Sequence, residues 1–177
     1  EIVEGMSKHL YSNDLGRFIR AIEVNGDGSL GSDATVDASL FGTFYFDCFA
    51  PDDEKVVGTM KAIEEKLAAG GGTARFENDG YMRASDAFTG NTWYICSLWL
   101  ADFHIAAART RKQLEPALSI LEWVAATALP SGVLAEQINP ETGEHVSVSP
   151  LTWSHSTFVA TVATYLGKDR SLRDRRK

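Results

Sequence analysis

The sequence has 177 residues, of which 44% are hydrophobic and 10% aromatic, and it carries a formal net charge of −7 at pH 7. This composition predicts a globular domain with a sizeable core and excludes a disordered chain. The acidic balance argues against a nucleic-acid partner and an anionic membrane surface, because both require a basic face, and no apolar run is long enough to span a bilayer.

Apolar residues at helical spacing predict about six helices. In chain order they cover residues 1–11, 34–49, 51–67, 91–108, 111–128 and about 150–166. Strand signal is confined to residues 17–24, which precede the Asn-Gly-Asp-Gly turn at 25–28. The segment 168–177 is highly charged and is predicted to be a solvated, frayed tail.

Two kinds of helix alternate along the chain. The helices at 51–67 and 111–128 are apolar on one side, whereas those at 34–49, 91–108 and 150–166 are apolar nearly all round. A helix that is apolar all round must be surrounded by protein, and a one-sided helix can cover it from outside. The pattern therefore predicts an all-α fold with an inner and an outer layer of antiparallel helices.

The connections between these helices are also of two kinds. Those that lead from an outer to an inner helix are long and cover residues 12–33, 70–90 and 129–149. In an up-and-down arrangement all three fall on the same face. Long loops on a rigid scaffold commonly carry function, so we expect the site on that face.

Glu136 is the candidate catalytic residue in the loop 129–149. It follows the small and apolar residues Val133-Leu134-Ala135 and precedes Gln137. A carboxylate in such a restricted environment could serve as a general base. Taken alone this is a weak signal, because most loop glutamates are solvated.

Three ordered motifs in the long-loop regions strengthen this interpretation. One reads Leu134-Ala135-Glu136-Gln137, followed by Pro150-Leu151-Thr152-Trp153-Ser154-His155. Upstream, Arg75-Phe76 precede Gly90-Asn91-Thr92-Trp93, and Asp37-Ala38-Ser39-Leu40 stand at the start of an inner helix. Over nearly the whole chain these motifs resemble the glucoamylase family, glycoside hydrolase family 15. Thr92 replaces the proline of the family motif.

The resemblance implies an (α/α)6 barrel, of which residues 1–167 would be the C-terminal part of the catalytic domain and about six helices one half. Members of the family hydrolyse α-glucosidic bonds with inversion, using a carboxylic acid and a carboxylate base. Glu136 would be the base. The acid lies in an earlier Trp-Glu-x-Arg-like motif that this sequence lacks, so we expect a missing N-terminal half of the barrel to supply it.

The resemblance also implies four sugar contacts, at Arg75, Trp93, Gln137 and Trp153. Tryptophan faces suit the apolar faces of pyranoses, and a guanidinium is a fixed fork of donors. The tryptophans and Arg75 have plainer alternatives, since the tryptophans could be core residues and Arg75 could form a loop-holding ion pair with Glu77 or Asp79. The substrate would be an α-linked glucose oligosaccharide or disaccharide.

The remaining candidates favour structural roles. His155, in the first turn of the last helix, is expected to position the Glu136 loop by a hydrogen bond, and His104 to be a hydrogen-bonded core residue. Cys48 and Cys96 are expected to be buried free thiols. No metal or other cofactor is expected, because the histidines lack metal spacing and the Asn25 loop has Val36 where a calcium loop has glutamate.

Three functional alternatives stay open. The Pro-Leu-Thr-Trp-Ser-His form favours the glucan-active members of the family, but a trehalase-type member is compatible. A non-catalytic helical scaffold or carbohydrate-binding module, with Glu136 vestigial, is the alternative from another class. The chain begins at Glu1 within helical sequence, so we expect further sequence upstream; no signal peptide is recognised, and a cytoplasmic location is favoured.

Overall fold

The computed structural model describes residues 1–174. Within them lie six α-helices and two short 3₁₀ helices. Their bounds are α1 Ile2–His9, η1 Ala38–Phe41, α2 Gly42–Tyr45, α3 Glu54–Lys66, α4 Tyr94–Ala107, η2 Arg111–Leu114, α5 Glu115–Thr127 and α6 Thr152–Asp174. The mostly helical fold with about six helices is as predicted. None of the helices in residues 1–174 combines the length and hydropathy needed to cross a bilayer.

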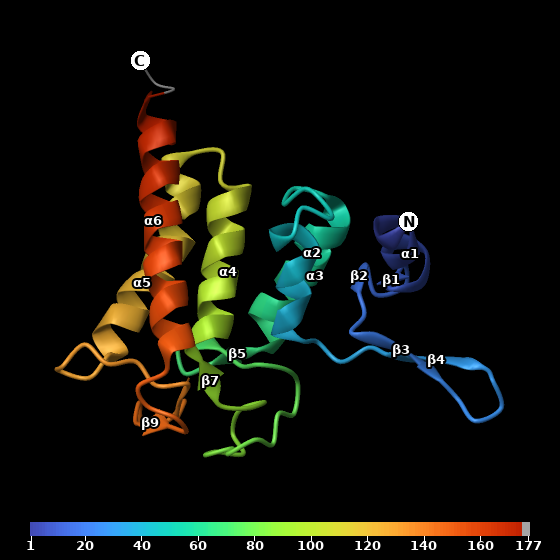
Figure 1. Ribbon diagram of the computed structural model, residues 1–177, viewed down its shortest axis with the longest axis horizontal. Coiled ribbons are helices and arrows are strands. Elements are labelled where there is room, and N and C mark those ends of the chain that lie inside the picture. The colour runs from blue at the N-terminus through green and yellow to red at the C-terminus, as the bar shows by residue number, and fades with distance from the viewer. Residues whose placement is uncertain (175–177) are drawn as a thin grey trace.

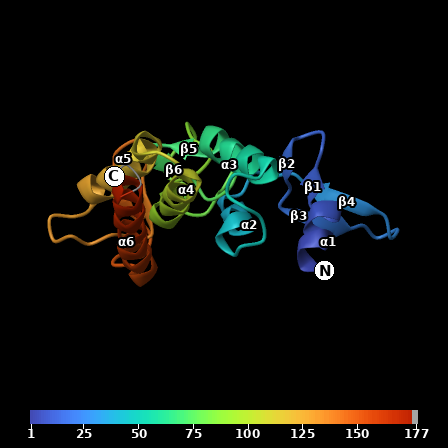
Figure 2. The ribbon, with the colours of Figure 1, turned by 90° about the horizontal axis from the view of Figure 1, so that it is seen from above.

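The helices stand in two layers that form an open arc. Seen from above, α3 and α5 make one row, and α2, α4 and α6 make the other (Figure 2). The central helix α4 packs against both α5 and α6, and beside α6 it runs nearly parallel to it in the view of Figure 1. This arrangement confirms the predicted alternation of outer amphipathic and inner apolar helices, and it is one half of a barrel.

The core lies between the two layers. On one side of α4, Cys96 and Leu100 pack with Val56, Met60 and Ile63 of α3. On its other side, a second group joins α4 to α5 and α6; its fully buried members include Tyr94, Leu98 and Val124. Because α4 is surrounded in this way, its sequence can be apolar on every side. Both cysteines are free thiols; Cys96 is buried as expected, whereas Cys48 is only partly buried.

The predicted helix at 34–49 is much shorter in the structure. It begins at η1, where the Asp37 carboxylate accepts a hydrogen bond of 2.8 Å from the backbone of Ser39, and it ends with α2 at Tyr45. Asp47 then adopts a left-handed conformation with φ 57°, which a helix cannot continue. Apolar residues continue up to Phe49, so hydrophobic patterning did not indicate that the helix ends at Tyr45.

The predicted frayed tail from Lys168 is a second correction. Helix α6 continues to Asp174, and Leu172 is buried against Leu114 and Ala117. Asp169 anchors this end, because its carboxylate accepts from Arg111 at 2.6 Å and pairs with Arg173 at 2.7 Å. Residues 168–174 are therefore docked helix, and residues 175–177 of the predicted tail lie outside the described part of the chain.

Short antiparallel strands join the helices. β2 Arg17–Phe18 and β3 Ala21–Val24 occupy the predicted strand region, and β3 turns back through residues 25–28 into β4 Leu30–Asp33. The others are β1 Tyr11–Ser12, β5 Ala68–Ala69, β6 Gly72–Thr73, β7 Thr92–Trp93, β8 Gln137–Ile138 and β9 His145–Val146. The sequence did not predict these, because two-residue strands show no periodicity.

The inner layer exposes large apolar side chains on its open side. Phe46 is 70% exposed and Trp153 53%, and both line a cavity that α2, α4 and α6 share. Asp102 of α4 also lines this side, between cavities of about 280 and 400 Å³ that α2 and α6 complete. Burial raises the pKa of the Asp102 carboxyl to about 6.

We expect Asp102→Asn to remove a pH-dependent loss of stability. The pKa of Asp102 in the folded chain lies above its ordinary value of 3.8, so below about pH 4 the carboxyl is neutral in both states and does not lower the stability of the fold. As the pH rises from about 4 to about 6, the free energy of unfolding falls, because the buried carboxyl resists ionisation. Above pH 6 the variant should be more stable than the wild type by about 1 to 3 kcal/mol. Urea unfolding at pH 4 and pH 8 measures the difference, with exposed Asp14→Asn as the control. Parallel stability curves for wild type and Asp102→Asn would contradict the expectation.

Candidate active site

Two of the long loops, 70–90 and 129–149, meet at the end of the bundle where α4 and α6 begin, at the bottom of Figure 1. They are joined by the small sheet in which β8 pairs with both β7 and β9, with Trp93 opposite Gln137. The third long connection reaches this face through Arg20, whose guanidinium lies 3.7 Å from Asp37 and 5.4 Å from the ring centre of Phe76. The predicted gathering of long loops on one face is confirmed.

Glu136 is half-buried and stands immediately before β8. Its backbone N–H donates to Val148 at 2.8 Å. In the carboxylate, Oε2 accepts from the Ser147 hydroxyl at 2.5 Å and from the Gln137 amide at 3.0 Å. Both donors that residues 1–174 supply to the carboxylate thus end on Oε2, which leaves Oε1 able to accept a proton from a reactant.

A second group of hydrogen bonds lies behind Glu136. Gln137 is completely buried, and its Oε1 accepts from Asn91 Nδ2 at 2.8 Å. Asn91 is 1% exposed and is bound to two backbone groups of the loop 70–90: it accepts from Ala84 N at 2.8 Å and donates to Met82 O at 2.9 Å. The loop is therefore hydrogen-bonded to the neighbour of Glu136.

Arg75 makes the ion pair that was the plainer alternative for it. Its Nε and one terminal nitrogen each donate to the Asp79 carboxylate at 2.8 Å, and Asp79 is buried. This hydrogen bonding raises the pKa of the Arg75 guanidinium above its ordinary value, and the charge of Glu136 adds to the shift. The guanidinium also lies 4.5 Å from the ring centre of Trp93. Two of the five N–H donors of an arginine are used by Asp79, and the others can bind a ligand.

The two tryptophans differ in setting. Trp93 is 5% exposed and lies beneath Arg75, and within residues 1–174 its buried indole N–H has no hydrogen-bond partner. Trp153 stands on the open side of α6, with an edge contact to Trp99 at 5.9 Å. The structure thus groups Glu136, Gln137, Arg75 and Trp93. In the described part of the chain, Trp153 makes no hydrogen bond or ring contact with them.

The start of α6 holds the Glu136 loop in place. His155 Nε2 accepts from the backbone N–H of Leu134 at 3.0 Å, and the Ser154 hydroxyl donates to the carbonyl of Ala135 at 2.7 Å. The backbone N–H of Leu151 adds a third bond, to the carbonyl of Leu134 at 3.0 Å. The structure therefore confirms the hydrogen bond expected of His155.

Two residues of the site were not singled out from the sequence. Ser147 contacts Glu136 from eleven positions away and has a left-handed conformation with φ 67°, for which a lone serine gives no signal. Asn91 was noticed only as part of a motif. Its contacts are with Gln137 and with the backbone of Met82 and Ala84, which lie apart from it in the sequence. His104 also differs from expectation, because its buried Nε2 makes no hydrogen bond and lies 3.5 Å from Glu64.

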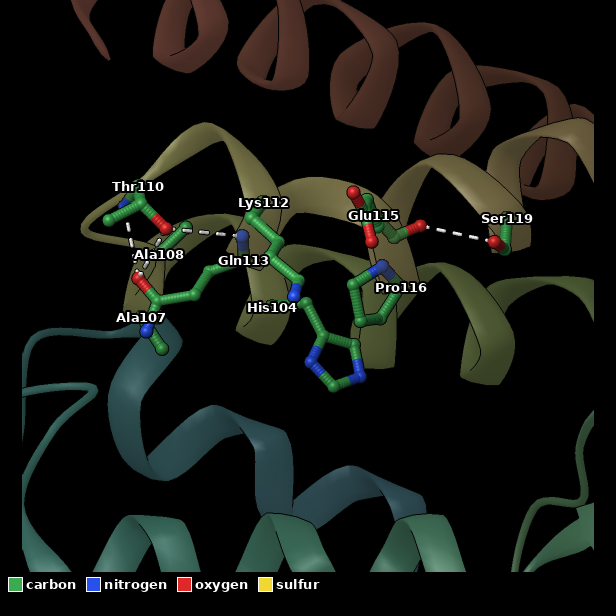
Figure 3. Close-up of a pocket in the computed structure, with 9 residues that line it drawn as sticks. All are labelled: His104, Ala107, Ala108, Thr110, Lys112, Gln113, Glu115, Pro116 and Ser119. Atoms are coloured by element: carbon green, nitrogen blue, oxygen red, sulfur yellow. Dashed lines mark hydrogen bonds between the residues drawn. The ribbon is translucent and has the colours of Figure 1, made fainter.

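A cavity of about 730 Å³ lies elsewhere, between the last turn of α4, η2 and the first turns of α5 (Figure 3). The bonds drawn there are local, such as the reciprocal cap between Thr110 and Gln113. α4 has 14 residues and is about 20 Å long, so its far end is remote from Glu136. None of the four grouped residues lines this cavity.

Among residues 1–174, no group of three or more His, Cys, Asp or Glu side chains could hold a metal ion.

Comparison with known proteins shows which family the chain belongs to. The sequence model described as "Glycosyl hydrolases family 15" matches residues 7–163. The chain belongs to this family. Among curated members and relatives, a glycosyl hydrolase of Methanocaldococcus jannaschii is 30% identical over 166 residues, which is 88% of this chain and 25% of that protein. A trehalase of Mycobacterium tuberculosis is 28% identical over 134 residues, covering 73% of this chain and 18% of the trehalase.

Solved structures agree with the half-barrel fold of this family 15 chain. A glycosidase variant in complex with glucose superposes on 93% of this chain with a TM-score of 0.72 and 23% identity, using 42% of its own length. A bacterial glucoamylase complexed with acarbose superposes on 94% of it with a TM-score of 0.75 and 20% identity, using 28% of its length. The chain thus spans a quarter or less of these curated relatives and less than half of either solved chain.

Proposed function

We propose that residues 1–174, which extend past the expected limit at 167 because α6 is docked to its end, form the C-terminal part of a catalytic domain that hydrolyses α-glucosidic bonds with inversion, and that Glu136 is its general base. The observation that carries this proposal is the one-sided hydrogen bonding of the Glu136 carboxylate. Ser147 and Gln137 both hold Oε2, so the carboxylate is fixed in orientation and Oε1 is left for a water molecule.

In this mechanism, Oε1 takes a proton from the water as the water oxygen attacks the anomeric carbon. An acid on the other side of the sugar protonates the departing glycosidic oxygen. Inversion requires the two carboxyl groups to stand about 6.5–9.5 Å apart, to leave room for the water. The nearby buried carboxylate of Asp79 is bound in the Arg75 ion pair, which makes it unsuited to be the acid. We therefore assign the acid to the rest of the catalytic domain.

Of the four sugar contacts that the resemblance implies, two are proposed to meet the sugar directly, and the other two, Trp93 and Gln137, are too buried for this and are proposed as supports. Arg75 and Trp153 are partly exposed and can meet the sugar directly, through unused N–H donors and an aromatic face. Trp93 and Gln137 lie beneath and support Arg75 and Glu136. The exposed apolar side chains of the inner layer favour a covering partner, which we propose is the N-terminal half of the barrel.

The substrate proposed is an α-linked glucose oligosaccharide. A second candidate is the disaccharide trehalose, because trehalases are among the relatives of this chain, from Mycobacterium tuberculosis, Mycolicibacterium smegmatis and Thermoplasma acidophilum. Both substrates present an α-glucosyl unit to the same acid and base. Parallel assays on maltotriose and trehalose distinguish the two candidates.

The stereochemistry of the product tests the proposal. A protein that carries this chain within a complete catalytic domain should release glucose from maltotriose first as the β-anomer, since attack by water inverts the α-linkage. Proton NMR of the anomeric signals, recorded within the first minutes, follows this. The isolated 177-residue chain should release no glucose. Initial α-glucose, or glucose release by the isolated chain, would overturn the proposal, and an inactive complete domain would favour a scaffold or sugar-binding role.

A further inference from the structure

A continuous series of hydrogen bonds runs from the loop 70–90 to the Glu136 carboxylate. It starts at Ala84 N, which donates to Asn91 Oδ1 at 2.8 Å, while Asn91 Nδ2 donates to Met82 O at 2.9 Å. The same Nδ2 donates to Gln137 Oε1 at 2.8 Å. Gln137 Nε2 in turn donates to Glu136 Oε2 at 3.0 Å. Two side-chain amides therefore separate the loop backbone from the carboxylate.

The backbone groups at the start of this series determine the orientation of both side-chain amides. A backbone N–H can only donate and a backbone carbonyl can only accept, so Ala84 and Met82 allow the Asn91 amide only one orientation. That orientation turns its NH2 group toward Gln137, whose oxygen is thereby occupied and whose own NH2 group must face Glu136. Asn91 is 1% exposed and Gln137 is 0% exposed, so little competition from solvent is possible.

We infer that Asn91 is a positioning residue for the Glu136 carboxylate, which links the placement of residues 82–84 to the orientation of the base through Gln137. If residues 82–84 move away, the Asn91 amide loses the two backbone groups that orient it. Gln137 is then free to turn its oxygen toward Glu136, which would repel the carboxylate instead of binding it. The consequence for catalysis rests on the proposed function, whereas the coupling itself rests on the hydrogen bonds alone.

The loop has internal bonds that hold residues 82–84 in this place. Arg83 donates to the carbonyls of Ser85, at 3.0 Å, and of Phe88. The Ser85 hydroxyl donates to Glu141 at 2.7 Å, across to the loop that carries the base. The segment is therefore bound both within its own loop and to the neighbouring loop. The backbone groups that contact Asn91 are held in place by these bonds.

NMR on the 177-residue wild-type chain tests the coupling without any substitution. As Glu136 titrates, the side-chain amide signals of Gln137 and Asn91 should both shift with the midpoint of the Glu136 carboxyl signal. The side chain of Asn139 is the internal control, because among residues 1–174 it only accepts bonds from Glu141 N and Thr142 N, in the turn that Asn139 begins. Asn91 signals that stay still while Glu136 titrates would overturn the inference.

A matched pair of substitutions tests the positioning role in a complete catalytic domain. Asn91→Asp keeps the shape but replaces the Nδ2 donor by an acceptor, so kcat should fall about tenfold or more with KM within about twofold. Asn139→Asp makes the same change where only an acceptor is needed, and it should leave both constants unchanged. Wild-type kcat for Asn91→Asp, in a protein whose Glu136→Gln variant is inactive, overturns the inference while the proposed function stands.

Discussion

Glu136→Gln in a complete catalytic domain is expected to lower kcat by roughly 10²–10⁴-fold while KM changes little, because a neutral amide cannot take the proton from water. The substitution keeps the size of the side chain, and an amide oxygen can still accept the bonds from Ser147 and Gln137 that reach Oε2. Substrate binding should therefore survive. Steady-state kinetics on maltotriose, with isothermal titration of the inactive variant by the same sugar, separates the two effects.

Glu144→Gln is the matched control for this prediction. Glu144 lies on the same loop and is exposed, and within residues 1–174 its carboxylate accepts a hydrogen bond only from the Thr142 hydroxyl, at 3.3 Å. Its replacement removes the same charge without touching the proposed base, so kcat should stay at the wild-type value. If Glu136→Gln turned over substrate as fast as Glu144→Gln does, Glu136 would have no part in proton transfer.

Gly58→Ala is expected to destabilise the chain by about 1 to 3 kcal/mol, although alanine is the better helix former by about 1 kcal/mol. A Cβ at Gly58 of α3 would lie 2.1 Å from the backbone carbonyl oxygen of Gly16, so the backbone must move. The segment displaced includes β2, where Phe18 is buried and its N–H donates to Thr59 at 2.9 Å. Urea unfolding of the purified chain measures the loss.

The same substitution at two other helical glycines should have the opposite sign. At Gly5 of α1 and Gly167 of α6 a Cβ would meet nothing within 4 Å. Alanine there should raise the free energy of unfolding by about 0.5 to 1 kcal/mol, because it restricts the unfolded chain and favours the helix. Equal stability changes at all three positions would show that the close approach of Gly16 does not matter.

Hydrophobic patterning was sufficient to predict the two helix layers and the face on which the candidate site lies. Inner and outer helices differ in how many sides they bury, and this difference is visible in residues 91–108 and 111–128. It was insufficient for the ends of elements. The helix predicted over 34–49 stops at Tyr45, and α6 runs on to Asp174 through a segment whose charges form ion pairs instead of meeting solvent.

The candidate site divides in the same way. Glu136, Gln137, Arg75 and Trp93 were all chosen from local motifs, and the structure places them together. Ser147 and Asn91 contribute through contacts that depend on a left-handed turn and on the pairing of β7 with β8. Sequence spacing does not report either feature, because both arise only when distant segments meet.

The pairing of β7 with β8 has a practical consequence for exchanging loops between relatives. The two strands belong to different loops, and the side chains of Asn91 and Gln137 complete the contact between them. A graft that replaces residues 70–93 alone would bring a foreign partner to the amide of Gln137. Residues 70–93 and 134–148 therefore form one transplantable unit, and a chimera should take both from the same donor protein.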